Sequence, residues 1–293
     1  MNKVKIWIVG WWTEGNAASI AERCIRNWPI GDLFELDSKN YEYLVVLGAF
    51  TPETLPYFKN TQTTIGVMLE PEWSPNWQRD LDKYCRLVLA QDRSMFPGAS
   101  NVIESPMFML THFLNHYSDF LEKTVSKTKR MSIISSNYSQ GFNYAKRHSL
   151  FKALLDTDLK IDFFGRGWDT SDFRYKGSPS NKADALLDYE YSIAIENSNY
   201  KNYVTEKFFD AIVTDTVPIY LGAPNISDIY PRESFIPLDV NGSIDQTIEQ
   251  IRHIFHNDEY NSRLQSLKNG KQSYYTSYNL FHFLERLISQ GKL

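Results

Sequence analysis

The chain has 293 residues, a length that suits two packed domains of about 120–150 residues better than one. Apolar residues make up 42% and charged residues 23%, which excludes a disordered or fibrous protein. The net charge of −4 excludes a broad basic field for nucleic acid or an anionic membrane. An anionic ligand must therefore be bound by locally placed cations.

The start of the sequence gives no sign of a targeting segment. Residues 4–9 form an apolar run that is too short to cross a bilayer and lacks the cleavage site of a signal peptide. Cys24 and Cys85 are the only cysteines, and two thiols in so long a chain are most simply buried small side chains. We expect a protein of a reducing compartment, cytoplasmic or peripheral to a membrane, without a transmembrane segment.

In residues 1–122, short apolar runs alternate with helical stretches. Strands are predicted at 6–9, 43–47, 65–69 and 87–89, and helices at 17–27 and 110–121. This alternation is typical of βαβ units and a parallel sheet. We therefore predict a Rossmann-like N-terminal domain over residues 1–122.

A second alternation follows the polar, cationic stretch 123–130, which we interpret as a domain linker. Strands are predicted at 132–135, 161–164, 191–195 and 217–221, and helices at 144–155, 183–189 and 204–213. Residues 131–275 then form a second domain, and the amphipathic segment 276–293 is predicted to pack back on the first. We predict an α/β fold class with two Rossmann-like domains facing across a cleft, an arrangement that resembles the GT-B glycosyltransferases.

Motifs for dinucleotides and metals are absent or weak. No Gly-x-Gly-x-x-Gly occurs, which argues against a dinucleotide-dependent dehydrogenase. His112 and His116 could share a helical face, but no third ligand is evident. Asp156 and Asp158 lie between a helix and a strand, on the wrong side of the sheet for a ligand, and are interpreted as a turn. We predict no metal site and no required cofactor.

The most informative stretch, residues 191–221, is predicted to be a strand, a polar loop, a helix and a strand. In an open α/β sheet, ligands bind at the carboxyl ends of strands, where this loop lies. A helix that starts near Val204 directs free N–H groups there; Lys207 adds a positive charge and Glu206 can accept hydrogen bonds from a ribose. The pattern fits a nucleoside diphosphate. Alternatively, Glu206 and Lys207 are ordinary solvated charges at a helix start.

Several short motifs follow one another in this half of the chain. They are Glu196-Asn197-Ser198, Tyr203-Val204-Thr205-Glu206-Lys207, Val217-Pro218-Ile219 with Gly222, and Pro231 with Ser234-Phe235-Ile236. This order resembles the signature of the α-1,3-fucosyltransferase family, glycosyltransferase family 10. The resemblance covers the whole second domain and the first only in patches. The cysteine pairs of animal members are missing, as expected of a bacterial or viral member.

The resemblance implies an inverting transferase that moves fucose from GDP-fucose to a hydroxyl of a glycan, with N-acetylglucosamine in a lactosamine as the usual acceptor. The second domain would bind the donor and the first the acceptor. The donor loop fixes the diphosphate and ribose more firmly than the sugar, so a transferase for another GDP-sugar is an alternative. A non-catalytic nucleotide- or carbohydrate-binding protein is another.

The resemblance also implies roles for individual residues. Glu206 would hold the ribose, and Lys207 and Arg147 would neutralise the diphosphate, although Arg147 can equally be a surface cation of its helix. The residues that would shape the fucose and phosphate pocket are Glu196, Asn197 and Tyr203.

The resemblance also implies a general base, because the base proposed for the family is a glutamate at the end of a strand, followed by a Ser-Pro element. Glu70 ends the strand predicted at 65–69, and Ser74-Pro75 follows it. The second acid, Glu72, is the alternative base because the alignment can shift there. The aromatic side chains that could stack on acceptor sugars are Trp11, Trp12 and Trp73, although each is also a candidate for the core.

Overall fold

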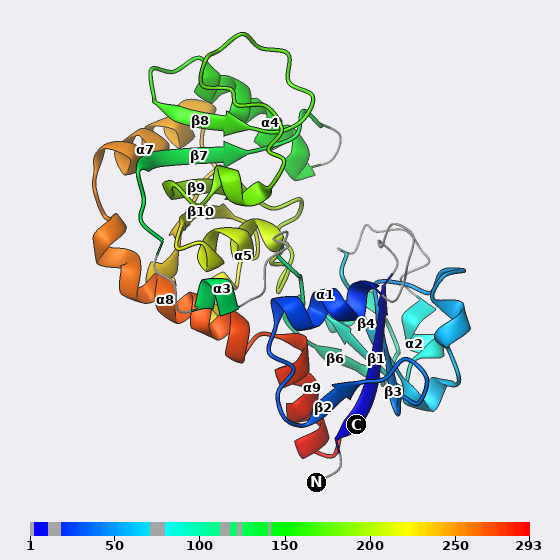
Figure 1. Cartoon of the computed structure of the whole chain (residues 1–293). Coiled ribbons are helices and arrows are strands. Elements are labelled where there is room, and N and C mark those ends of the chain that lie inside the picture. The colour runs from blue at the N-terminus through cyan, green and yellow to red at the C-terminus, as the bar shows by residue number, and fades with distance from the viewer. Residues whose placement is uncertain (1–2, 11–18, 71–79, 112–117, 122–124, 140–141) are drawn as a thin grey trace.

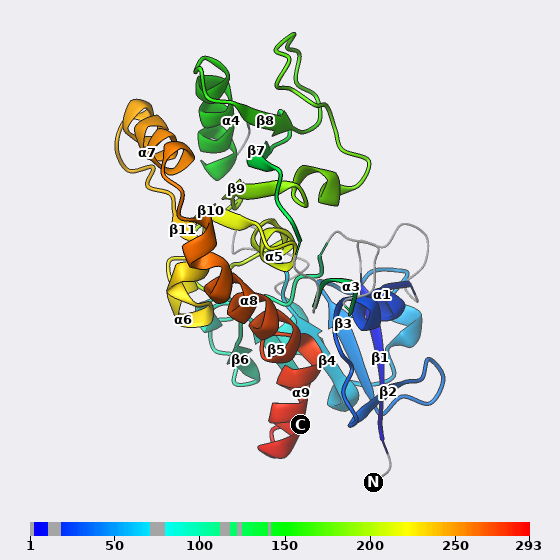
Figure 2. The same ribbon diagram turned by 60° about the vertical axis from the view of Figure 1, so that its left-hand side comes forward.

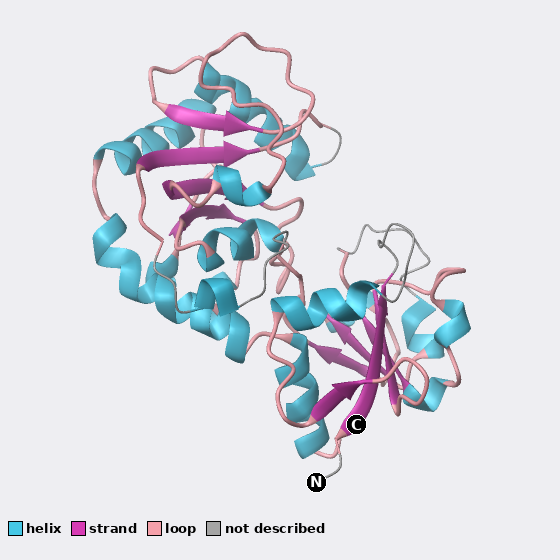
Figure 3. Ribbon diagram, in the orientation of Figure 1, coloured by secondary structure: helices cyan, strands magenta, loops and turns pink. Residues whose placement is uncertain are grey.

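A computed structural model of the chain describes residues 3–10, 19–70, 80–111, 118–121, 125–139 and 142–293. In these residues the strands form two parallel sheets, one in each half of the chain, with helices packed around them (Figure 1, Figure 3). The N-terminal domain lies at the lower right of Figure 1 and the C-terminal domain at the upper left. The predicted α/β fold with two parallel-sheet domains is therefore confirmed.

The N-terminal sheet has the strand order β2-β1-β3-β4-β5-β6, and all its pairs are parallel. Its central strands are almost continuously apolar and buried, as expected for a parallel sheet covered on both faces, whereas the two edge strands are only partly buried. The elements of this half are β1 (Val4–Gly10), α1 (Ser19–Asn27), β2 (Phe34–Leu36), β3 (Tyr43–Leu47), β4 (Thr64–Val67), α2 (Leu81–Tyr84), β5 (Leu87–Ala90), β6 (Val102–Glu104) and the short α3 (Ser118–Leu121).

The C-terminal sheet is also parallel, in the order β11-β10-β9-β7-β8. Helices pack on both of its faces (Figure 2). The elements are β7 (Lys129–Ile134), α4 (Phe142–Leu155), β8 (Ile161–Phe164), β9 (Tyr189–Ile195), α5 (Glu206–Val213), β10 (Val217–Leu221), α6 (Ile226–Ile229), β11 (Ile236–Pro237), α7 (Ile244–His256), α8 (Tyr260–Thr276) and α9 (Leu280–Ser289).

In both sheets, the side on which the chain adds strands changes after the first two strands. The chain goes from β7 to β8 on one side and then to β9 on the other, just as it goes from β1 to β2 and then to β3. Crossover connections on opposite faces leave a crevice at the carboxyl ends of the two central strands, and ligands bind there in doubly wound folds. The fold thus directs a ligand of the C-terminal domain to the ends of β7 and β9.

The last two helices connect the domains. Helix α8 runs along the C-terminal domain toward the other half of the molecule, and α9 lies beside the N-terminal sheet (Figure 1, Figure 2). Phe281 of α9 packs against Phe34, with ring centroids 6.3 Å apart, and Phe283 packs against Phe108 at 5.2 Å. The apolar face of α9 is therefore buried against the N-terminal domain.

Each predicted strand is present, with ends shifted by a few residues. The helix predicted at 183–189 is wrong: residues 182–185 form a single 3-10 turn, and Tyr189 already belongs to β9. Strand β7 begins at Lys129, inside the predicted linker. Lys127, also in that stretch, is partly buried and donates to the carbonyl oxygens of Leu187 and Thr214 at 2.9 and 2.6 Å.

Two smaller predictions, the buried cysteines and the turn at Asp156, are also confirmed. Cys24 and Cys85 are free and buried, as predicted. Asp156 follows α4 in a turn, and Asp158 forms an ion pair with Arg252 at 2.7 Å. Among the described helices, none is both long enough and apolar enough to cross a membrane.

Candidate active site

The loop after β9 is folded back by a buried carboxylate. Glu196 follows the strand and is fully buried; its two carboxylate oxygens accept hydrogen bonds from the backbone N–H and the hydroxyl of Thr205, at 2.7 and 2.6 Å. Thr205 is in turn the N-cap of α5, because its hydroxyl oxygen accepts from the N–H of Lys207 at 3.3 Å. The helix therefore starts directly beside the strand end.

Close packing fixes this carboxylate. A Cβ atom at Gly222 would lie 2.5 Å from Cγ of Glu196 and 2.2 Å from the hydroxyl oxygen of Tyr220, so only glycine fits. Burial raises the pKa of Glu196, and the nearby ammonium of Lys207, 3.6 Å away, opposes that rise. Glu196 thus fixes the loop and the start of α5 through its hydrogen bonds to Thr205, without lining the cavities described below.

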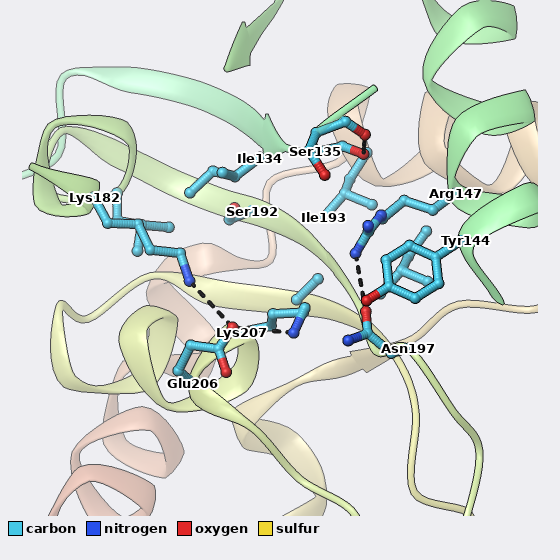
Figure 4. Close-up of a pocket in the computed structure, with 14 residues that line it drawn as sticks. Ile134, Ser135, Tyr144, Arg147, Lys182, Ser192, Ile193, Asn197, Glu206 and Lys207 are labelled. Atoms are coloured by element: carbon cyan, nitrogen blue, oxygen red, sulfur yellow. Dashed lines mark hydrogen bonds and ion pairs between the residues drawn. The ribbon is translucent and has the colours of Figure 1, made fainter. Parts of the chain in front are cut away.

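A cavity of about 260 Å³ opens at the carboxyl ends of β7 and β9, at the crevice that the strand order predicts (Figure 4). We call it the β7–β9 cavity. Its polar lining comes from the end of β7, from α4, from the 3-10 turn before β9, from β9 and the loop after it, and from the start of α5. These residues are Ser135, Ser136, Tyr144, Arg147, Lys182, Ser192, Asn197, Glu206 and Lys207.

Arg147 enters this cavity from α4 with spare hydrogen-bonding capacity. It is only 6% exposed, and burial lowers its pKa. The guanidinium lies 4.7 Å from the ring centre of Tyr144 and donates to Oδ1 of Asn197 at 3.3 Å, while Nε has no hydrogen-bond partner among the described residues. A buried guanidinium with an unused N–H is costly, and an anion in the cavity would stabilise its charge.

Lys207 and Glu206 form the opposite wall. The ammonium of Lys207 lies 3.0 Å from Oε1 of Glu206, and this same oxygen lies 3.8 Å from Lys182 (Figure 4). Burial lowers the pKa of Lys207, but attraction to Glu206 and Glu196 outweighs burial, so the pKa is raised overall. The lysine therefore stays charged at any ordinary pH.

A second cavity, of about 290 Å³, lies between the domains and shares three residues with the first. We call it the interdomain cavity. From the N-terminal domain, Glu70 and Arg23 line it; from the C-terminal domain, Asn197, Tyr203, Thr205, Glu206 and Lys207 do so. Burial raises the pKa of Glu70, with Lys207 lowering it and Glu206 raising it further. The charges on the two domains are thus close enough to affect one another.

Most of the predicted site residues that the structure describes are brought together. Arg147, Asn197, Glu206 and Lys207 line the β7–β9 cavity, and Tyr203 and Glu70 line the interdomain cavity. Glu196 lines neither, because its carboxylate is engaged with Thr205. The predictions for Glu72, Trp11, Trp12 and Trp73 lie outside the described residues.

Sequence reasoning missed several lining residues. Ser135 and Ser136 follow directly after β7, and small polar residues at a strand end were a signal that could have found them. Lys182 and Arg23 left no such signal. Lys182 belongs to a turn that precedes β9, and its ammonium lies 2.8 Å from the fully buried Asp210, a contact that only the fold creates.

The fold resembles that of solved glycosyltransferases. An α1,3-fucosyltransferase solved with GDP-fucose has a TM-score of 0.56 and 17% sequence identity, over 98% of this chain and 90% of that one. The same kind of enzyme solved with GDP has a TM-score of 0.57 and 18% identity, over 98% and 89%. The predicted GT-B arrangement is thereby confirmed.

Sequence comparisons narrow this likeness to a family. The chain is 34% identical over 146 residues to the Drosophila melanogaster glycoprotein 3-alpha-L-fucosyltransferase A, which is 47% of this chain and 27% of that protein. The Caenorhabditis elegans alpha-(1,3)-fucosyltransferase fut-5 is 31% identical over 139 residues, 46% and 36% of the two chains. The match thus spans about a third or less of these relatives. The family model for the C-terminal part of glycosyltransferase family 10 (fucosyltransferase) matches residues 124–278, more than half of the sequence. The chain therefore belongs to glycosyltransferase family 10, the fucosyltransferases.

Proposed function

We propose that the protein transfers fucose from GDP-fucose to a hydroxyl of a glycan acceptor, with inversion at the anomeric carbon. One observation carries this proposal: Glu70 of the N-terminal domain lines the same cavity as Glu206 and Lys207 at the start of α5. The carboxylate of Glu70 therefore shares a cavity, across the domain interface, with the ammonium of Lys207, which can bind an anion. The family, and the names of the relatives, support fucose as the sugar that is transferred.

In the donor complex, the diphosphate lies at the N-terminus of α5, where the first N–H groups and the positive end of the helix dipole favour an anion. The guanidinium of Arg147 donates to a phosphate oxygen from one side of the cavity, and Lys207 adds its charge from the other. Glu206 accepts from the ribose hydroxyls. The pocket for the sugar and phosphate is shaped by Asn197 and Tyr203, and by Glu196 through its hydrogen bonds to Thr205.

The reaction is a single displacement. Glu70 takes the proton of the acceptor hydroxyl, whose oxygen attacks the anomeric carbon of fucose from the side opposite the diphosphate. The bond between that carbon and the phosphate oxygen breaks, and its electron pair leaves with GDP. Lys207, Arg147 and the helix N-terminus stabilise the negative charge that grows on this oxygen, so the step needs no metal ion.

We propose the N-terminal domain as the acceptor site and N-acetylglucosamine of a lactosamine as the acceptor, with Trp11, Trp12 and Trp73 as stacking surfaces. The decisive experiment offers GDP-fucose, GDP-mannose and UDP-sugars to a panel of glycan acceptors and identifies the product by mass. Transfer of a deoxyhexose from GDP-fucose alone is expected. Transfer from another GDP-sugar would replace the donor, and nucleotide binding without transfer to any acceptor would replace the enzyme by a binding protein.

Nucleotide selectivity is a first prediction. GDP should raise the melting temperature more than UDP or CMP at equal concentration, because a ligand that binds only the native state stabilises it by mass action. Differential scanning fluorimetry measures the three shifts side by side. An equal or larger shift with UDP would contradict a guanine site.

Independence from metals is a second prediction. Since the diphosphate is left to Lys207, Arg147 and the helix N-terminus, EDTA should leave most of the transfer rate intact. The assay compares initial rates with EDTA, with Mn²⁺ and without additions. A complete loss on chelation that Mn²⁺ restores would show that these cations do not suffice.

A further inference from the structure

A buried asparagine joins the two domains beside the candidate active site. Asn202 lies in the loop between β9 and α5, is 8% exposed and has a φ of 61°. Its side-chain N–H donates to the backbone oxygen of Gln91, at the end of β5 in the N-terminal domain, at 2.7 Å. Met107 of the N-terminal domain donates its N–H to the backbone oxygen of Asn202 at 3.3 Å.

A second asparagine fixes the orientation of this amide. Asn225 donates its side-chain N–H to Oδ1 of Asn202 at 2.9 Å, and its own Oδ1 accepts from the backbone N–H of Asn202 at 2.8 Å. Because Oδ1 of Asn202 is thereby occupied, its NH₂ group must point away from Asn225, toward Gln91. The orientation of the amide that donates across the interface to Gln91 is thus set by Asn225 of the C-terminal domain.

The connection continues toward Glu70 on the other side. The side chain of Gln91 is 2% exposed and donates Nε2–H to the backbone oxygen of Met68 at 2.8 Å. Met68 stands two residues before Glu70, just as Asn202 stands shortly before the α5 cap Thr205. One series of buried hydrogen bonds therefore links the strand end that carries the candidate base to the loop that carries the candidate phosphate site.

We propose that Asn202 is a positioning residue that holds Glu70 at a fixed separation from the Lys207 phosphate site. This inference rests on the proposed transfer reaction. The acceptor oxygen must lie between its base and the anomeric carbon, and a displacement of about 1 Å can cost about 10²-fold in rate. Because the base and the phosphate site belong to different domains, this distance depends on contacts across the interface, and Asn202 supplies a buried one next to both.

An exposed contact at the same interface serves as the matched control. Lys201, the neighbour of Asn202, forms an ion pair with Glu104 of β6 at 2.7 Å. Both side chains are well exposed, so water and salt screen their attraction. Lys201→Ala should therefore leave transfer within about twofold of the wild type, although it removes a contact between the same two domains.

Two substitutions separate the side chain of Asn202 from its backbone. Asn202→Gly keeps the left-handed backbone without strain and removes the amide. Asn202→Asp keeps the shape but places an acceptor against the oxygen of Gln91. We expect transfer kcat to fall about 10–100-fold in both variants, with GDP affinity, measured by calorimetry, within about twofold. Melting temperatures show that each variant is folded.

Hydrogen exchange gives a readout that does not depend on activity. In Asn202→Gly, amides in peptides covering residues 64–70 should exchange faster than in the wild type or in Lys201→Ala, without any substrate present. An unchanged kcat, or a GDP affinity that falls in step with kcat, would overturn the proposal. If the wild type transfers no fucose, the proposed reaction fails, and unchanged exchange at 64–70 would then also overturn the positioning contact.

Discussion

Glu70→Gln should lower the rate of fucosyl transfer by about 10²–10⁴-fold, the usual contribution of a general base, while GDP affinity stays nearly unchanged. The amide keeps the shape of the side chain but cannot take a proton from the acceptor. Steady-state transfer rates and calorimetric GDP binding, measured on the same preparation, test both halves of this expectation. A variant that retains full activity would remove Glu70 from the reaction.

The pH profile adds an independent check on Glu70. Burial raises its pKa, and a base acts only when ionised, so transfer should rise as the pH rises through that raised value. Glu70→Gln should lose this limb of the profile. Glu72→Gln is the comparison and should cost about tenfold at most if Glu72 only contacts the acceptor. A silent Glu70→Gln beside an inactive Glu72→Gln would move the role to Glu72.

Lys207→Met should reduce turnover by about 10²–10³-fold, since it removes a charge aimed at the phosphate oxygen on which negative charge grows in the transition state. Methionine keeps the unbranched stem in the cavity wall. Glu206→Ala, which alters the neighbouring residue, should instead weaken donor binding, because its carboxylate is proposed to hold the ribose. Initial rates over a range of GDP-fucose concentrations separate an effect on kcat from one on KM.

A stability control is needed for Lys207→Met. The ammonium lies 3.6 Å from the fully buried carboxylate of Glu196, which loses its nearest cation in this variant. The melting temperature without nucleotide shows whether the variant is folded at the assay temperature. A folded variant that keeps wild-type turnover would mean that Glu206 and Lys207 are ordinary charges at a helix start.

Local pattern predicted the fold well where strands are apolar and central. The buried strands β3, β5 and β10 are short apolar runs, and their alternation with helices indicated two parallel sheets. Edge elements were harder: β11 has only two residues, too few for any periodicity. In α8, buried positions include Lys271, whose ammonium pairs with buried Asp215 at 2.5 Å, so its buried face cannot be recognised by hydrophobicity.

The site residues likewise divide into those that local position predicts and those that only tertiary packing places. Glu206 and Lys207 stand in the first turn of α5, and Glu70 follows β4 by three residues, so topology alone brings them to a ligand crevice. Lys182 and Arg23 reach the cavities from segments distant in sequence, so their place depends on tertiary packing. Asn202 offered only the tolerance of asparagine for a positive φ, which is equally typical of an ordinary turn.

The chain crosses between the domains twice, and the described residues that flank the two crossings lie close together. Thr111 is still bound to Asn27 of α1, at 2.8 Å, whereas the oxygen of Phe120 already accepts from α8 at 3.0 Å. On the return path, the hydroxyl of Tyr274 donates to the oxygen of Met109 at 3.2 Å. Neighbouring covalent connections permit rotation about an axis through them but resist separation. A cut after α8 would leave the halves covalently joined, whereas a cut between residues 111 and 118 would leave only noncovalent contacts, such as the packing of α9 on the N-terminal domain, to hold them together. With both connections intact, opening of the cleft would be a pivot rather than a dissociation.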